Sequence, residues 1–337
     1  MLRRPARWTW PWGAAAAGLL AALVVPLVLP DAYWMRVLNV AMLYMILSMS
    51  LALIDGFTGQ PSLGHAAFYG VGAYTSALGM LNLGLPFPVA ALAATAVTGV
   101  LGLCVGPITR LRGFYLALAT LALGQVVYLL FLNVEPITRG PIGVRGIPPA
   151  SIGPLVLAND GAYYYLILAA VVLTYVVMKR ITTGQLGRIL SAIRQNELST
   201  AAMGVNTTRY KVQIFGIGCA FAGLAGSLYA HLVNFISPNA FLFQDSITIV
   251  AMTVVGGMRS FEGAILGALV LGLLPEVARP LKDFRLLVYG FVFLLFMVYL
   301  PGGIVGLLRD LARVLARRAA AARPAAQPDP ALAAVDR

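Results

Sequence analysis

The chain has 337 residues, of which 60% are hydrophobic and 11% are charged, whereas soluble domains average about 45–50% apolar and about 25% charged residues. With a mean hydropathy of +0.87, this composition excludes a soluble enzyme, a disordered chain and a disulfide-rich secreted domain, and it indicates a polytopic membrane protein. The net charge of +12 is better explained by the excess of Lys and Arg in cytoplasmic loops than by nucleic-acid binding. The two cysteines, Cys104 and Cys219, lie in apolar runs and predict neither a disulfide nor a metal site.

Charge-free stretches give the candidate membrane spans, because a charge near the bilayer centre is costly. The stretch 56–109 is long enough for two passes of about 20 residues each, with a turn at residues 82–88, which contain Gly84 and two prolines. The full set of candidate runs is 13–30, 37–54, 56–109, 113–134, 161–178, 212–244, 246–258, 263–275 and 286–308.

The runs 246–258 and 263–275 are each too short to cross a core about 30 Å thick at about 1.5 Å per residue. If a cytoplasmic turn at residues 259–262 separates them, the chain makes ten passes, both termini are inside, and most of the 24 Lys and Arg residues are cytoplasmic. If they form one span, the chain makes nine passes and the basic C-terminal tail lies outside. The positive-inside rule favours ten. We therefore predict an all-α integral membrane protein of about ten transmembrane helices, some of them short or broken.

The first run follows three arginines, as a signal peptide would, but no small-residue cleavage site ends it, so a retained helix is predicted. The transmembrane domain is expected over residues 1–309. Residues 310–337 are dominated by Ala, Arg and Pro, and a segment of this composition is typical of a disordered cytoplasmic tail. The outside loop 135–160 is rich in Pro and Gly, and it is either a plain connector or a docking surface for a soluble protein.

The glycine-interrupted segments 56–79 and 256–272 are candidates for the solute pathway, because broken helices at corresponding positions of two halves mark such pathways. The alternative is that their glycines only allow close helix packing. In the first segment, Pro61 fits a first helical turn after Gln60, which would place Ser62 and His65 on one helix face. These polar residues either line the pathway or satisfy neighbouring backbone groups. In the second segment, Arg259 and Glu262 are predicted to pair across the turn, with Ser260 as the N-cap.

The longest cytoplasmic segment, residues 179–211, carries six basic residues and one acid, Glu197. Apolar residues from Leu190 to Met203 approximate the spacing of a short amphipathic helix, and Gly204 follows at a C-cap position. A capping sequence at residues 206–208 then starts the next helix. Such a segment is suited to docking a cytoplasmic partner.

Four separated motifs resemble the LivM-type permeases, the membrane subunits of branched-chain amino acid ABC importers. The motifs are GFTGQPSLGHAAFYGVGAY at 56–74, AIRQNE with AAMGVN and RYK within 187–211, FGIGCAFAGLAGSLYA at 215–230, and GGMRSFEGAILG at 256–267. The outside stretch GPIGVRGIP at 140–148 also fits. The departures are Arg259 and Glu262 in the glycine-rich turn and Gln195 where Glu is more usual.

The resemblance implies a fold of about ten helices with one cytoplasmic coupling helix per subunit. It also implies a second, LivH-type permease, two ATP-binding cassette subunits and a periplasmic substrate-binding protein as partners, in a bacterial inner membrane. Within the coupling helix, Ala201, Ala202 and Gly204 would fit an ATPase cleft, and Arg194 and Glu197 would orient the helix at its rim. The expected cargo is leucine, isoleucine or valine, or a related small polar solute such as urea, an amide or an aromatic acid.

No G-x-x-x-x-G-K-[ST] sequence occurs, so ATP and magnesium are expected on partner subunits and no cofactor on this chain. The alternative function is a stand-alone ion-coupled secondary transporter. Such carriers place ionisable groups inside the membrane, and His65, His231 and Glu262 are the weak candidates here. An integral-membrane enzyme is disfavoured, because the two histidines lie far apart in the sequence and form no ligand cluster.

Overall fold

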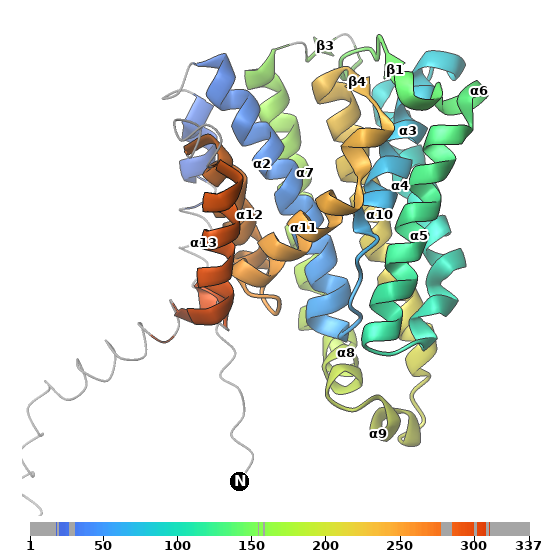
Figure 1. Ribbon diagram of the computed structural model, residues 1–337, viewed down its shortest axis with the longest axis vertical. Coiled ribbons are helices and arrows are strands. Elements are labelled where there is room, and N and C mark those ends of the chain that lie inside the picture. Colours follow the sequence, from blue (N-terminus) through green and yellow to red (C-terminus); the bar gives the residue numbers. More distant parts are fainter. Residues whose placement is uncertain are drawn as a thin grey trace, which may run out of the picture.

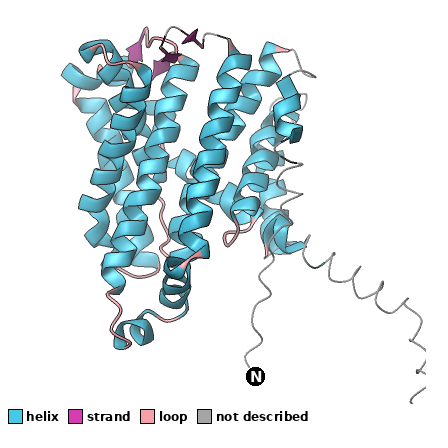
Figure 2. Ribbon diagram, turned by 180° about the vertical axis from the view of Figure 1, so that it is seen from behind, coloured by secondary structure: helices cyan, strands magenta, loops and turns pink. Residues whose placement is uncertain are grey.

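The computed structural model is a bundle of helices with small strands at one end only (Figures 1 and 2). It describes residues 18, 20–26, 31–153, 155–157, 159–277, 285–299, 302–307 and 310. Of the predicted first span, 13–30, only residues 18 and 20–26 are therefore described, and of the predicted tail, 310–337, only residue 310.

Six segments of the described chain are long and apolar enough to cross a membrane, which supports the predicted all-helical membrane class. They are Ala32–Phe57, Phe87–Arg110, Phe114–Asn133, Asp160–Thr183, Thr207–Val233 and Pro238–Gly256. The remaining long helices, α3 (His65–Leu83), α12 (Phe261–Val277) and α13 (Arg285–Tyr299), are shorter or less apolar. The number of ten passes stays a prediction.

Helix α10 (Thr207–Val233) packs closely against α3 and α4 (Phe87–Val105) because small residues line the contact. A Cβ atom on Gly72 of α3 would lie 2.3 Å from the carbonyl oxygen of Gly223, and one on Gly226 would lie 2.0 Å from that of Tyr69. Helix α2 (Ala32–Leu51) continues into a π-helical turn, η1 (Ala52–Phe57), and packs against α7 (Asp160–Thr183) and α12. The glycines of α3 and α10 thus bring the helix backbones together in the core.

The two short runs form separate helices, α11 (Phe243–Gly256) and α12, joined by a tight turn. Ser260 Oγ accepts the Gly263 N–H at 2.8 Å, so the predicted N-cap is confirmed. The predicted pairing of Arg259 with Glu262 is wrong. Glu262 instead binds Lys179 at 2.5 Å and Tyr175 at 2.8 Å, because α7 brings these two side chains beside the start of α12.

The loop 135–160, predicted to lie outside, is folded over the end of α10. It contains α6 (Glu135–Thr138), η3 (Gly140–Ile142) and three short strands, β1 (Val144–Arg145), β2 (Ser151–Ile152) and β3 (Leu155–Val156). Strand β1 pairs antiparallel with β4 (Phe235–Ile236), and β2 pairs with β3. The Asn234 side chain donates to the Ile147 carbonyl at 2.9 Å, and Nδ1 of His231 lies 2.8 Å from the Pro148 carbonyl oxygen. This loop lies at the end of the molecule opposite α8 and α9 (Figure 1).

Candidate functional site

A hook of two short helices projects from the end of the bundle opposite the strands (Figures 1 and 2). We name residues 184–206 the docking segment. It consists of α8 (Gln185–Gln195) and α9 (Glu197–Ala202), so the single amphipathic helix predicted from Leu190 to Met203 is wrong. The backbone is extended at Asn196, whose side chain accepts the Ser199 N–H at 3.0 Å and starts a new helix.

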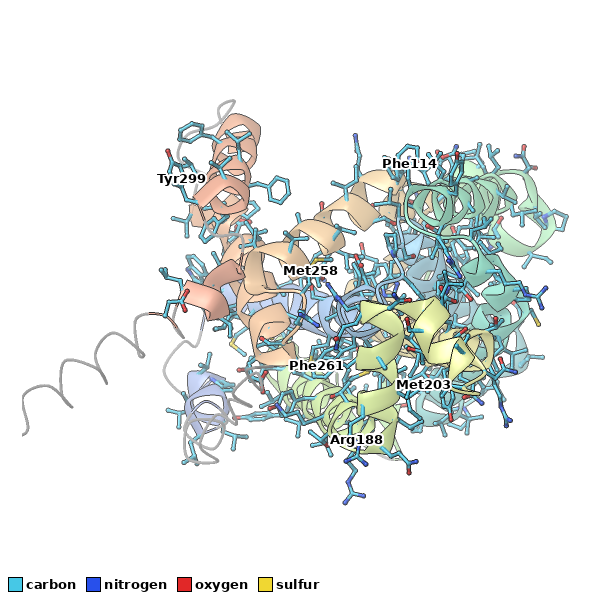
Figure 3. The ribbon with its side chains drawn as sticks, turned by 90° about the horizontal axis from the view of Figure 1, so that it is seen from below. Phe114, Arg188, Met203, Met258, Phe261 and Tyr299 are labelled. Atoms are coloured by element: carbon cyan, nitrogen blue, oxygen red, sulfur yellow. The ribbon has the colours of Figure 1, made fainter. Side chains whose placement is uncertain are left out.

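The docking segment turns apolar side chains both inward and outward. Leu190 and Ile193 are buried against the bundle, whereas Leu198 and Met203 are 67% and 84% exposed. Between α8 and α9 lies an open groove of about 390 Å³, lined by Arg188, Ser191, Ala192, Gln195, Asn196, Ser199, Thr200 and Met203. Figure 3, viewed along the bundle, shows Arg188 and Met203 on this projecting end.

The predicted coupling residues fall into two groups. Ala201, Ala202 and Gly204 are exposed at the far edge of the docking segment, and Gly204 has a positive φ of 83°, which suits glycine after a helix end. Arg194 and Glu197 instead contact their own chain: Arg194 donates to the Asp55 carbonyl at 3.0 Å. Their contacts with an ATPase rim stay a prediction.

Glu197 joins three elements. Its carboxylate lies 3.3 Å from Nζ of Lys211 in α10 and 3.2 Å from Nε of Arg112, just before α5 (Phe114–Asn133). Thr207 Oγ1 also donates to it, at 3.3 Å. The start of α9 is thereby tied to the starts of α5 and α10.

Arg194 ties α8 to the end of η1. The aliphatic part of its side chain also covers Gly59, whose φ of +71° is a conformation that glycine tolerates. Burial lowers the pKa of the Arg194 guanidinium, as does the charge of Arg259, while the charge of Asp55 opposes this. The docking segment is therefore attached to the chain that leads into the transmembrane region.

A non-helical segment, residues 59–64, follows η1 and separates it from α3. We name it the break. The predicted helical turn starting at Pro61 is wrong, because α3 begins only at His65, and Ser62 and His65 do not share a helix face. The Leu63 N–H donates to Thr120 Oγ1 of α5 at 3.0 Å, which gives this backbone group a partner outside a helix.

The structure buries the three predicted pathway residues. Gln60, Ser62 and His65 are 1%, 2% and 0% exposed. Gln60 Nε2 donates to Thr58 Oγ1 at 2.7 Å and to the Lys211 carbonyl at 3.4 Å. Among the described residues, no partner is found for Gln60 Oε1, Ser62 Oγ or His65 Nδ1.

The hydrogen bonds of His65 indicate its tautomer. Ser50 Oγ donates to the Leu47 carbonyl at 2.8 Å. Nε2 of His65, 2.7 Å from the same hydroxyl oxygen, is therefore the donor to it, and Nδ1 is left as an acceptor. The other histidine is engaged differently: Nε2 of His231 lies 2.9 Å from Ser76 Oγ, which in turn accepts from Ser227 at 2.7 Å.

A second break, which was not predicted from the sequence, precedes α11. The chain runs from β4 through η4 (Pro238–Phe241), and α11 then starts at about half the height of the bundle (Figure 1). Ser246 Oγ accepts the Ala66 N–H at 2.9 Å, so the first turns of α3 and α11 meet. The signal was present: Ser237-Pro238 interrupts an apolar run much as Gln60-Pro61 does.

The glycines of 256–272 pack helices. A Cβ atom on Gly256 would lie 1.9 Å from the Gly263 carbonyl oxygen, and one on Gly267 would lie 2.0 Å from that of Met252. These contacts support the packing interpretation for this segment. Within the described residues, no group of three His, Cys, Asp or Glu side chains could hold a metal ion.

The fold and the two sites describe a multi-pass transport subunit: interrupted helices meet inside the bundle, and a docking segment projects from one end. Residues 33–300 match the family described as branched-chain amino acid transport system, permease component. The chain is 34% identical over 321 residues to the high-affinity branched-chain amino acid transport system permease protein LivM of Escherichia coli K12, covering 86% of this chain and 75% of that protein. It is 25% identical to a probable LivM of Methanocaldococcus jannaschii, over 78% and 90% of the two chains, and 24% identical to LivH of E. coli K12, over 78% and 91%. No solved structure matches the chain.

The chain belongs to the family of branched-chain amino acid transport permeases. This confirms the resemblance drawn from the four sequence motifs. The relatives named above are transport permeases, not enzymes.

Proposed function

We propose that this chain is the membrane-spanning permease subunit of an ATP-driven importer. Its cargo is leucine, isoleucine, valine or a related small polar solute, delivered by a periplasmic binding protein. Two ATP-binding cassette subunits carry ATP and magnesium, and a second, LivH-type permease completes the membrane part. The subunit lies in a bacterial inner membrane, crosses it about ten times and keeps both termini in the cytoplasm.

The structure of the docking segment is the main observation that supports this proposal. Exposed apolar side chains on a membrane protein's water-facing end are suited to a protein partner, and here Leu198 and Met203 are exposed, Met203 at the open groove. The family membership supports an importer as the machine that uses it.

The contacts of the docking segment support a route from ATPase to solute pathway. Arg194 joins α8 to the Asp55 carbonyl at the end of η1, and Gln60 in the break reaches the Lys211 carbonyl at the start of α10. A displacement of the docking segment therefore acts on the start of the break, directly through the Asp55 carbonyl and, by way of Glu197 and Lys211, through Gln60. The π-helical turn η1 is a short element of a kind often found at functional sites.

The contacts also disfavour the ion-coupled alternative. A coupling ion needs a titratable group that is free to change its partners. Glu262 is paired with Lys179, both nitrogens of His231 have partners, and the Asp245 carboxylate accepts the Leu242 N–H. His65 keeps one nitrogen without a partner among the described residues, but it is fully buried.

The proposal is tested by tagging this chain in its native membrane, extracting it gently and identifying the co-purifying proteins by mass spectrometry. We expect a second permease and two ATPases with Walker-type sequences. Recovery of the chain alone, as a monomer or a homodimer, would overturn the proposal.

The coupling route is tested separately with Arg194→Ala. Losing the link to η1 should lower leucine uptake while the assembled ATPases still hydrolyse ATP, and Arg194→Lys should restore part of the uptake. Arg180→Ala is the matched control, because Arg180 is an exposed cytoplasmic arginine at the end of α7. Equal uptake by the Arg194→Ala and Arg180→Ala transporters would contradict the route.

A further inference from the structure

One face of the bundle carries polar side chains at the depth of the bilayer centre. They come from α5, η4 and α11, three elements that contact one another, and we name them the polar face: Gln125, Tyr128, Asn239, Gln244, Asp245 and Thr248. Gln125, Asn239 and Gln244 are exposed, and the other three are half-buried. In Figure 1, α11 lies between α13 and α5, and the break is visible between α11 and α5.

The contacts fix the depth of the polar face. Gln125 lies eleven residues after Phe114, the cytoplasmic end of α5, which is about 17 Å along a core about 30 Å thick. On α11, Gln244 belongs to the first turn, next to Ser246, which meets the start of α3. Tyr128 OH joins the two sides through Asn239 Oδ1 at 3.4 Å.

These side chains are costly in hydrocarbon, because lipid offers no hydrogen-bond partners. Asp245 adds a carboxylate, which accepts the Leu242 N–H at 3.0 Å. Helix α4 exposes no such amide or carboxylate: its exposed large side chains, Val89, Leu92, Val97, Val100 and Leu103, are all apolar. The α4 face is therefore suited to lipid, and the polar face is suited to protein or water.

We propose that the second permease subunit packs on the polar face and that Gln125, Asn239 and Gln244 line the solute path between the two subunits. This inference rests on the proposed function and assigns its pathway to residues other than those predicted. Gln60, Ser62 and His65 lie behind the face, within the chain, where the break supports the first turns of α3 and α11. A zwitterionic cargo crossing the bilayer centre needs polar partners there, and the amides supply both donors and acceptors.

The test places the photo-crosslinking residue p-benzoylphenylalanine at position 244, and separately at 125, in the complete transporter. Position 92 on α4 is the matched control. We expect irradiation to join positions 244 and 125 to the second permease, identified by mass spectrometry, and position 92 to give no such protein adduct. Having two positions keeps the test valid if one variant does not assemble.

The failures of the two proposals can be told apart. If the partners co-purify but the second permease is crosslinked from position 92 and not from 244 or 125, the polar face is not the interface, although the proposed function stands. A crosslink to a second copy of this chain would also overturn the inference. If no partners co-purify, the proposed function itself has failed.

A side-chain variant tests the pathway part. Gln244→Leu should lower leucine uptake by about tenfold, equivalent to about 1.4 kcal/mol in the barrier, while leaving the subunit composition unchanged. Leu92→Ala should leave uptake unchanged. Full uptake by an assembled Gln244→Leu transporter would show that this side chain does not line the path.

Discussion

The contact between Gly64 and α5 allows a sharp test of the break. A Cβ atom on Gly64 would lie 2.2 Å from the Thr120 carbonyl oxygen, whereas one on Gly124, across the same contact, would lie 3.4 Å from the Cα of Gly64. The backbone of Gly64 has a φ of −107°, which alanine adopts freely. Any effect of Gly64→Ala therefore comes from the added methyl group and not from backbone strain.

The magnitude follows from this distance. The start of α3 must retreat by about 1 Å to reach ordinary contact at about 3.5 Å, and such overpacking costs about 1–3 kcal/mol. The retreat also breaks the hydrogen bond from the Leu63 N–H to Thr120 Oγ1, which contributes about 0.5–1.5 kcal/mol. We expect Gly64→Ala to destabilise the protein by about 2–4 kcal/mol.

Thermal unfolding in detergent and leucine uptake in membranes measure the effect. Gly64→Ala should lower both the unfolding temperature and the uptake per inserted molecule. Gly124→Ala should lower neither, because it adds a methyl group at ordinary contact distance and replaces glycine in a helix interior, where alanine is favoured. Indistinguishable behaviour of the two variants would refute the close approach of the break to α5.

Three further variants probe other contacts. Gly204→Asp should abolish uptake in a protein that still inserts, because it adds a charge and backbone strain at the exposed end of the docking segment. Gly184→Asp, at an exposed glycine of negative φ, should retain uptake. Equal uptake by the two variants would refute the docking role. Glu262→Gln should lower the stability by about 1.5–3 kcal/mol in thermal unfolding, because it weakens a charged hydrogen bond to Lys179; an unchanged unfolding temperature would contradict this. His65→Ala should destabilise the protein by about 2–5 kcal/mol, because it removes a fully buried ring. It should change the uptake per folded molecule little. A complete loss of uptake with normal expression would assign His65 to the pathway.

The predictions that the structure confirms rested on residues that act on the neighbouring backbone. Ser260 caps α12 as its position before an apolar run predicted, and Asn206 caps α10. The interruption around Gly59-Gln60-Pro61 was also located, because glycine and proline act on their own backbone. In each case the signal and its effect lie within a few residues.

The errors came from competing local signals and from distant partners. Asn196 divides the docking segment because its side chain caps α9, and this outweighs the apolar spacing of one continuous helix. Glu262 pairs with Lys179, 83 positions away, and the folding of α7 against α12 that brings them together is not visible in the spacing of residues 259–262. The burial of His65 likewise depends on α2, which supplies Ser50.

Helix α10 runs from one face of the membrane to the other as one continuous helix. It has 27 residues without proline and is therefore about 40 Å long. Glu197 of the docking segment binds Lys211 near its start, and His231 holds the loop 135–160 near its other end. A tilt of about 5° at its start would shift this loop by about 3–4 Å over the length of the helix. In the proposed importer, the ATPases and the loaded binding protein would therefore act on the two ends of one helix.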